Sequence, residues 1–103
     1  MTKETVGVYI STLNDLYGNL LTQKQREMLR LYYDCDTSLA EIATQYGVTR
    51  QAVRDVVERS VATLEGYEAA LHLAQKKGDL SLACANLPES EQKKAILQLV
   101  ENL

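Results

Sequence analysis

The chain has 103 residues, 46% of them hydrophobic and 24% charged, with a formal net charge of −3 and a pI near 5.1. This length predicts one soluble domain, residues 1–103, with a modest core. No apolar run is long enough to span a bilayer and the start, MTKETVGVYIST, has no signal-peptide pattern, so we expect a cytoplasmic protein without membrane contact. The acidic balance counts against strong non-specific binding to DNA.

An all-α fold is predicted, because the chain has no alternating β-branched stretch and a single proline. Residues 4–17 are expected to form an amphipathic helix that ends at Gly18, with a helical stripe of six apolar side chains: Val6, Tyr9, Ile10, Leu13, Leu16 and Leu20. Thr22 and Gln25 have the spacing of a capping box, so a second helix should run from there to about Tyr33. A polar link over residues 34–37 follows.

The stretch SLAEIATQYGVTRQAVRDVVERSVATL, residues 38–64, predicts a helix-turn-helix. Ala43 is small where two helices must cross closely, and Gly47 stands where the first helix must end with a positive φ. Val48 and Val53 are expected to fill the angle between the helices. Thr49 has the side chain to cap the second helix. We therefore place a helix-turn-helix core at residues 22–65, and this motif most often presents its second helix to DNA.

Residues 66–103 are predicted to form a helical extension. The second helix of the motif either runs on to about Lys77 or breaks near Gly66, because glycine costs about 1 kcal/mol in a helix. Gly78 and Asp79 predict a turn, residues 80–85 a short helix, and Pro88 the first turn of a last helix at residues 89–103.

A stripe along the long helix suggests a homodimer. Its members recur at about 3.5 residues, as in a coiled-coil seam: Val57, Ser60, Leu64, Tyr67, Leu71 and Ala74. The alternative is that the last helix folds back and covers this stripe within one chain. Pairing is slightly favoured, because two weak half-site contacts add on one nucleic acid.

Two segments carry a family resemblance. LTQKQREMLRLYY (residues 21–33) followed by SLAEIATQYGVTRQAV (residues 38–53) resembles region 4 of sigma-70-type factors, which reads the −35 promoter element. Residues 13–53, with the LYGNLLT entry and the YEAALHL tail, resemble even more the YlxM-type helix-turn-helix proteins of Gram-positive bacteria. That resemblance implies a small regulatory protein associated with the signal recognition particle pathway. Compared with sigma factors, the second helix has fewer basic residues, because Ala52 stands where sigma factors usually carry a basic or polar side chain and Asp55 places a negative charge near the phosphates.

The candidate nucleic-acid-binding residues lie at the start of the second motif helix. Arg50, Gln51 and Arg54 face outward if Val53 points inward, with Thr49 at the cap, and Arg and Gln suit guanine and adenine edges in the major groove. Two further candidates for phosphate contact, Lys24 and Arg26, lie on the preceding helix. The alternative for all of these is an ordinary solvated helix face, with Glu27 pairing near the two cations.

No catalytic, metal or cofactor site is predicted. The chain has no P-loop, no GxGxxG motif and no nucleophile elbow. His72 is the single histidine, with no second ligand at a metal-binding spacing. Cys35 and Cys84 are expected to be buried or half-buried thiols rather than a disulfide.

Two functions fit these features. In the first, the protein is a regulator that binds nucleic acid, either DNA or the RNA of the signal recognition particle. In the second, it is an adaptor that docks on a protein component of that particle without binding nucleic acid. A DNA binder should gather its cations on one face, whereas an adaptor should expose an apolar patch.

Overall fold

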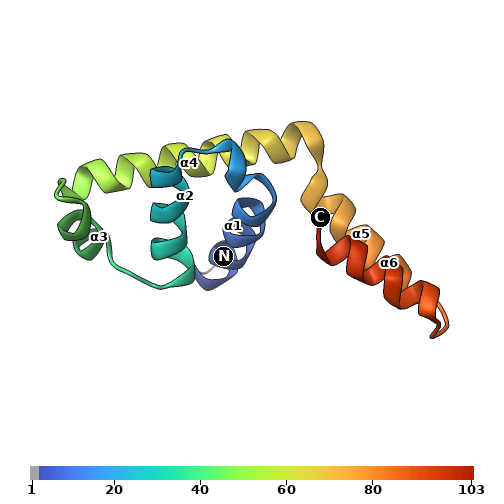
Figure 1. The fold of residues 1–103 in the computed structure, drawn as a ribbon. Coiled ribbons are helices and arrows are strands. Elements are labelled where there is room, and N and C mark those ends of the chain that lie inside the picture. Colours follow the sequence, from blue (N-terminus) through green and yellow to red (C-terminus); the bar gives the residue numbers. More distant parts are fainter. Residues whose placement is uncertain (1–2) are drawn as a thin grey trace.

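The computed structural model describes residues 3–103, and every regular element within them is helical (Figure 1). The α-helices are α1 (Lys3–Tyr17), α2 (Gln23–Leu29), α3 (Leu39–Tyr46), α4 (Arg50–Leu71), α5 (Leu73–Ala85) and α6 (Glu91–Glu101). A 3-10 turn, η1 (Gly18–Leu20), precedes α2, and a π-helical turn, η2 (Arg30–Asp34), continues it. The predicted all-α class is confirmed. No helix in this described part of the chain is both long enough and apolar enough to cross a membrane.

Helix α4 organises the molecule. Its 22 residues form one continuous rod, against which α1, α2 and α3 pack on one side. Helices α5 and α6 form an antiparallel hairpin that projects from the C-terminal end of α4 (Figure 1). The molecule is consequently elongated, with principal extents of 53 × 26 × 25 Å. We call residues 3–71 the body and residues 73–103 the hairpin.

The local signals at the start of the chain are confirmed. Helix α1 ends at Tyr17, directly before Gly18. At Gly18 a Cβ atom would lie 2.7 Å from Asn14 Oδ1, so a larger residue cannot fit without displacing that side chain. The capping box of α2 is complete, because the Gln25 N–H donates to Thr22 Oγ1 at 3.2 Å and the Thr22 N–H donates to Gln25 Oε1 at 2.9 Å.

The core lies inside the body and draws side chains from all four of its α-helices. Its buried members are Ile10, Leu13, Tyr17, Met28, Leu29, Leu31, Ile42, Ala43, Val53, Val57 and Leu64. Of the six residues in the predicted α1 stripe, Ile10 and Leu13 are buried in this core and Val6 and Leu16 pack against it, partly buried. The other two are exposed, Tyr9 by 44% and Leu20 by 60%. Leu20 falls outside because the helix has already ended, and Tyr17 fills the last inward position of α1 instead.

The predicted dimer seam on α4 is wrong in its first half. Ser60 and Leu64 are fully buried and Val57 is 5% exposed, because α1 and α2 cover this stripe within the same chain. Tyr67 is half-buried, with its ring 5.9 Å from that of Tyr17. The alternative, that the last helix covers the stripe, also differs from the structure, since α6 packs along α5.

The long helix breaks at a residue that the sequence did not single out. Both alternatives for the long helix differ from the structure, because α4 passes through Gly66 without a break and ends at Leu71, before Lys77. The predicted turn at Gly78 and Asp79 and the short helix at residues 80–85 are both part of the continuous helix α5. The break is at His72, whose φ of 56° is in the left-handed region. After Pro88 the last helix begins at Glu91, where Ser90 Oγ accepts the Lys93 N–H at 3.1 Å.

One carboxylate fixes the junction between the body and the hairpin. Glu68 Oε1 accepts hydrogen bonds from the Tyr17 hydroxyl at 2.7 Å and the Ala74 N–H at 2.9 Å, and its Oε2 accepts the Gln75 N–H at 3.2 Å. Tyr17 Oη also accepts the Leu73 N–H at 3.0 Å. Glu68 therefore caps α5 from the preceding helix and ties it to α1.

The electrostatics of this junction favour an ionised carboxylate. Burial raises the pKa of Glu68, but the hydrogen bonds from Tyr17, Ala74 and Gln75 and the nearby His72 lower it, and the net result is a pKa below the ordinary value. Burial, followed by the hydrogen bond to Glu68, raises the pKa of the Tyr17 phenol. Tyr17 therefore remains a hydrogen-bond donor to a charged acceptor, which is the stronger kind of hydrogen bond.

The interior of the hairpin is thin. Among its described side chains the buried ones are Cys84, Val100 and the aliphatic stem of Lys93. The Lys93 ammonium reaches out to Glu89 Oε1 at 2.7 Å. Both cysteines were expected to be buried or half-buried. Cys84 is buried, as expected, whereas Cys35 in the body is exposed, so the expectation is wrong for Cys35.

Candidate nucleic-acid interface

The turn between α3 and α4 has the geometry that the sequence predicted. Gly47 ends α3 with a φ of 66°, in the left-handed region where glycine carries no steric penalty. The N–H of the next residue, Val48, donates to the Ala43 carbonyl at 3.0 Å. Since a Cβ at Gly47 would meet nothing within 4 Å, the requirement for glycine comes from the backbone angle rather than from space.

The crossing of the two helices is filled from α3 and α4 rather than from the turn. Ala43 is 6% exposed and Ile42 and Val53 are fully buried. Val48, which was expected to plug the angle, is 36% exposed. The physical reason is that the left-handed turn at Gly47 carries residue 48 around the outside of the corner. The small side chain of Ala43 is therefore what allows the close approach of α4.

Thr49 holds the start of α4. Its hydroxyl oxygen accepts the Ala52 N–H at 3.0 Å, as the predicted cap requires. The residue is itself exposed. This cap fixes where α4 begins and therefore which of its residues project beyond α3.

The three predicted readers on α4, Arg50, Gln51 and Arg54, are exposed, and the last two of them lie near a carboxylate. Gln51 Nε2 donates to Asp55 Oδ1 at 2.9 Å, and Arg54 Nε lies 3.4 Å from Glu58 Oε1. The Arg54 and Glu58 side chains are 59% and 68% exposed, so this ion pair is weak and can exchange its partner readily. Asp55 and Glu58 nevertheless reduce the positive potential of this surface.

Arg50 lies beside the first turn of α3. It borders a shallow hollow together with Tyr32, Ser38, Leu39 and Ala40. The Ser38 hydroxyl accepts the Glu41 N–H at 3.1 Å and donates to Glu41 Oε1 at 2.9 Å, which caps this helix start. Arg54 borders an adjoining hollow that also includes Tyr32 and Leu39. Arg50 and Arg54 therefore share one flank of α4, next to the positive end of α3.

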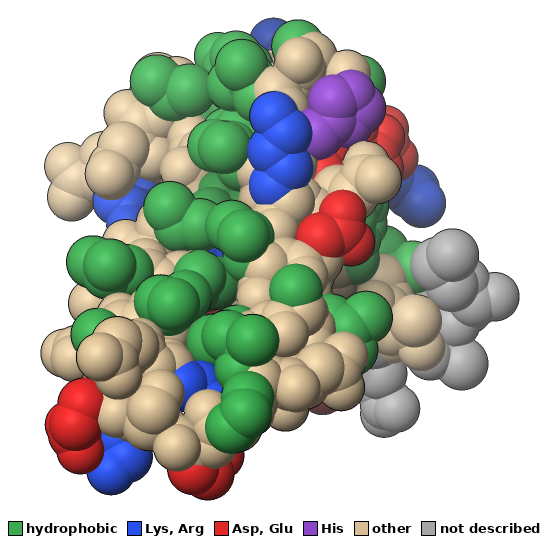
Figure 2. All heavy atoms as spheres, turned by 90° about the vertical axis from the view of Figure 1, so that its right-hand side faces the viewer, with side chains coloured by type: hydrophobic (Ala, Val, Ile, Leu, Met, Phe, Trp, Pro, Cys, Tyr) green, Lys and Arg blue, Asp and Glu red, His purple; other side chains and the backbone are tan. Residues whose placement is uncertain are grey.

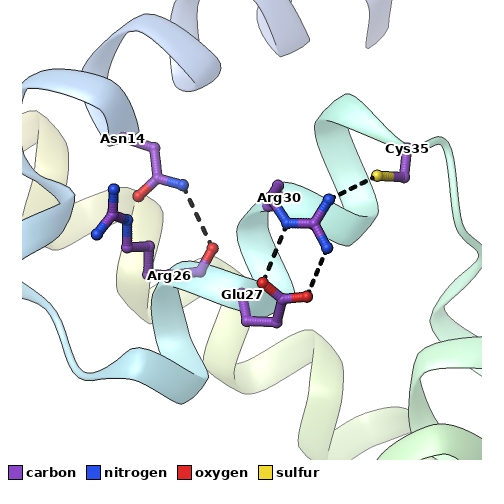
Figure 3. Close-up of polar contacts among 5 residues, drawn as sticks. All are labelled: Asn14, Arg26, Glu27, Arg30 and Cys35. Carbon is purple, nitrogen blue, oxygen red and sulfur yellow. Dashed lines mark hydrogen bonds and ion pairs between the residues drawn. The ribbon is translucent and has the colours of Figure 1, made fainter.

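The two candidates on α2 do not join this flank as a group. Lys24 borders a different hollow, with Tyr46 at the end of α3. Arg26 turns toward the end of α1, where its Nη1 donates to Asn19 Oδ1 at 2.7 Å. Its backbone carbonyl accepts a hydrogen bond from Asn14 Nδ2 at 3.3 Å (Figure 3). The structure thus brings Arg50 and Arg54 together but separates them from Arg26.

Glu27 pairs with Arg30 rather than with Lys24 or Arg26. Arg30 donates from Nε to Glu27 Oε2 at 3.0 Å and from Nη2 to Oε1 at 2.6 Å, while its Nη1 lies 3.2 Å from Cys35 Sγ (Figure 3). The hydrogen bond from Arg30 lowers the pKa of Glu27. The sequence contained a signal for this pair in its spacing of three residues.

The chain matches a known protein family over residues 4–103, the family UPF0122, described as "Putative helix-turn-helix protein, YlxM / p13 like". A UPF0122 protein of Desulforamulus reducens is 54% identical over 67 residues, which cover 65% of this chain and 57% of that protein. A UPF0122 protein of Clostridium kluyveri is 41% identical over 96 residues, covering 93% of this chain and 78% of that protein.

A UPF0122 protein of Bacillus cereus strain AH187 is 41% identical over 99 residues, covering 88% of this chain and 90% of that protein. The alignments to the Clostridium and Bacillus proteins include both the body and most of the hairpin. The family is described by a helix-turn-helix and not by an enzymatic activity. The chain therefore belongs to the UPF0122 family of YlxM/p13-like helix-turn-helix proteins.

Proposed function

We propose that this protein is a regulator that binds nucleic acid through the first two turns of α4. The observation that carries the proposal is the shared flank of Arg50 and Arg54, exposed beside the N-terminus of α3 and held there by the Gly47 turn and the Thr49 cap. In a helix-turn-helix this arrangement allows the second helix to enter a major groove while the first helix start meets a phosphate.

The residues have separate roles in this proposal. Arg50 and Gln51 contact base edges, since they stand in the first turn of α4 and their side chains match guanine and adenine. Arg54 contacts a phosphate after releasing Glu58. Lys24 and Arg26 add at most peripheral phosphate contacts, because they border other parts of the body.

Binding is expected to be weak and sensitive to salt. Few cations face the groove, and the carboxylates of Asp55 and Glu58 lie among them. Each lost phosphate contact therefore removes a large part of the electrostatic binding free energy. The target is a DNA duplex or a helical part of signal recognition particle RNA, and the protein acts in the cytoplasm in the pathway of that particle.

A second candidate function is a protein adaptor of the same particle. It is favoured by the carboxylates of Asp55 and Glu58 on the reading surface and by the net charge of −3. In this case α4 contacts a protein partner, and added nucleic acid does not displace that partner from α4.

Fluorescence anisotropy distinguishes the two. The protein is titrated into a mixed-sequence DNA duplex, a pool of randomised duplexes and signal recognition particle RNA, each at two salt concentrations. We expect binding that weakens with salt, with R50A and R54A each lowering affinity and reducing the salt slope by about one where a phosphate contact is lost. The matched control is R59A, since Arg59 is exposed on α4 but lies on the other flank. Failure of all three ligands to bind at low salt would favour the adaptor.

A further inference from the structure

The hairpin carries an apolar face that its own chain leaves exposed. Leu80 is 48% exposed, Ile96 41%, Leu99 71% and Leu103 55%, and the loop between the helices adds Leu87 at 46%. Viewed from that end of the molecule, hydrophobic side chains gather over a large part of the surface (Figure 2). By contrast, the described interior of the hairpin contains few buried side chains.

These side chains share one flank of the hairpin. With about 100° of rotation per residue, the inward direction is given by Cys84 on α5 and by Val100 on α6. Measured from these positions, Leu73 and Leu80 on α5 and Ile96 and Leu99 on α6 fall on the same side of the two antiparallel helices. Together with Leu87 in the loop and Leu103 just after α6, we call these six leucine and isoleucine residues the hairpin face. Leu82 falls on the opposite side of α5.

The spacing within the hairpin face suits packing against other helices. Leu73, Leu80 and Leu87 follow one another at intervals of seven residues, and Ile96, Leu99 and Leu103 at intervals of three and four. Such rows form the ridges that interdigitate in helical bundles.

Charge is nearly absent from the hairpin face. Lys76 is the one charged side chain within this face, at about 80° of helix rotation from Cys84 on the side of Leu80, whereas Asp79, Lys94 and Glu101 lie on other sides of the two helices. A lipid surface or a nucleic acid would require a row of cations here. A face with a single cation and regularly spaced leucines is complementary to the same face of a second copy of this chain.

We propose that the hairpin face binds the hairpin face of a second copy of this chain, so that two hairpins form a four-helix bundle about a two-fold axis. The exposed parts of its six side chains amount to roughly 600 Å², at the upper end of the largest apolar patches on monomers and near the roughly 800 Å² that each partner contributes to a standard interface. A two-fold axis brings the same surface of both copies together.

The bundle gives the hairpin the second layer that it lacks. Two helices in one layer bury little, and a domain needs at least two layers around a core. Because Glu68 and Tyr17 tie α5 to the body, the bundle also fixes the two bodies relative to each other.

The test is the mass in solution of the whole chain, measured by sedimentation equilibrium up to about 100 μM. The parent is expected at twice the chain mass of 11.5 kDa. L99E should raise the dimer dissociation constant at least about tenfold. Its matched control is L82E, which places the same charge at a similarly exposed leucine, 68% against 71%, on the opposite side of the hairpin. L82E should remain a dimer.

Circular dichroism of each variant checks that helix content is unchanged. Since Leu99 and Leu82 are both exposed in the monomer, neither substitution should unfold the body. A parent that sediments as a monomer over the whole range overturns the proposal. So does an L99E variant that stays dimeric, or an L82E variant that dissociates as readily as L99E.

Discussion

The body and the hairpin use the same residue types in opposite ways. In the body, apolar side chains from α1, α2 and α3 pack against those of α4 and are buried, as Leu13, Ile42 and Leu64 are. In the hairpin, Leu80, Leu82 and Leu99 remain about half or more exposed. The difference shows that the hydrophobic core of the molecule lies in the body, whereas the hairpin leaves most of its large apolar side chains exposed.

The largest expected effect contrasts a core leucine with a hairpin leucine. L64A should lower the free energy of unfolding by about 2–5 kcal/mol, because it leaves a cavity where α1 and α4 meet. L82A should change it by less than about 0.5 kcal/mol, because Leu82 is mostly exposed already. Urea unfolding of both variants measures the difference. Equal losses would mean that the hairpin contributes to the core as much as the body does.

A second substitution tests the crossing of α3 and α4. A43L should destabilise the protein by about 1–3 kcal/mol, because the larger side chain would overpack the place where α4 approaches most closely. The control A40L adds the same atoms to an exposed position of the same helix and should be nearly neutral. Thermal melts that coincide for A43L and the parent would contradict the observed crossing.

The parts of this fold that could be predicted from the sequence are those that depend on near neighbours. Thr22, Thr49 and Gly47 act through hydrogen bonds or backbone angles within four residues, and the structure confirms each of them. The covering of the α4 stripe could not be predicted, because Val57 and Leu64 have the same spacing whether they face another copy or their own α1. Periodicity shows which side of a helix is apolar, not what lies against it.

The break between α4 and α5 was missed for a related reason. Gly66 and Gly78 permit a break, but a helix that continues through a glycine is destabilised by only about 1 kcal/mol at each one. At His72 the first free N–H groups of α5 are taken up by Tyr17, which lies far away along the chain, and by Glu68 in the last turn of α4. The contact from Tyr17 could not be read from the local sequence. In the candidate site, likewise, the helical spacing predicted that Arg50 and Arg54 are neighbours. It could not predict that Arg26 points away from them, because this depends on how the end of α1 packs beside α2, where Arg26 binds Asn19.

A third prediction concerns this junction. E68Q should raise the hydrogen-exchange rate of the first amides of α5, with a local cost of about 1–2 kcal/mol, because an amide replaces a charged acceptor and loses one oxygen. Amides in the middle of α4 should keep their protection. E65Q, at an exposed position of the same helix, is the control. Unchanged exchange at Ala74 and Gln75 would show that the junction does not rest on the carboxylate.

The smallest expected effect is the dependence of this junction on pH. The pKa of Glu68 is lowered from its ordinary value of 4.5 in the folded protein. A carboxylate of this kind contributes stability that is fully present above the unfolded value and is lost as pH falls through the folded one. The stability difference between the parent and E68Q should therefore be constant above about pH 6 and shrink below 4.5.

Glu27 provides the comparison within the body. Its pKa is also lowered, but Arg30 and Glu27 have side chains that are 47% and 37% exposed, so solvent screens the pair and E27Q should have little effect at any pH. Urea titrations of the parent, E68Q and E27Q between pH 3 and pH 7 measure both differences. If the difference for E68Q does not diminish in acid, the carboxylate is not the charged cap of α5. If E27Q shows the larger dependence, acid acts on the body first, and the hairpin is not the part of the molecule that loosens at low pH.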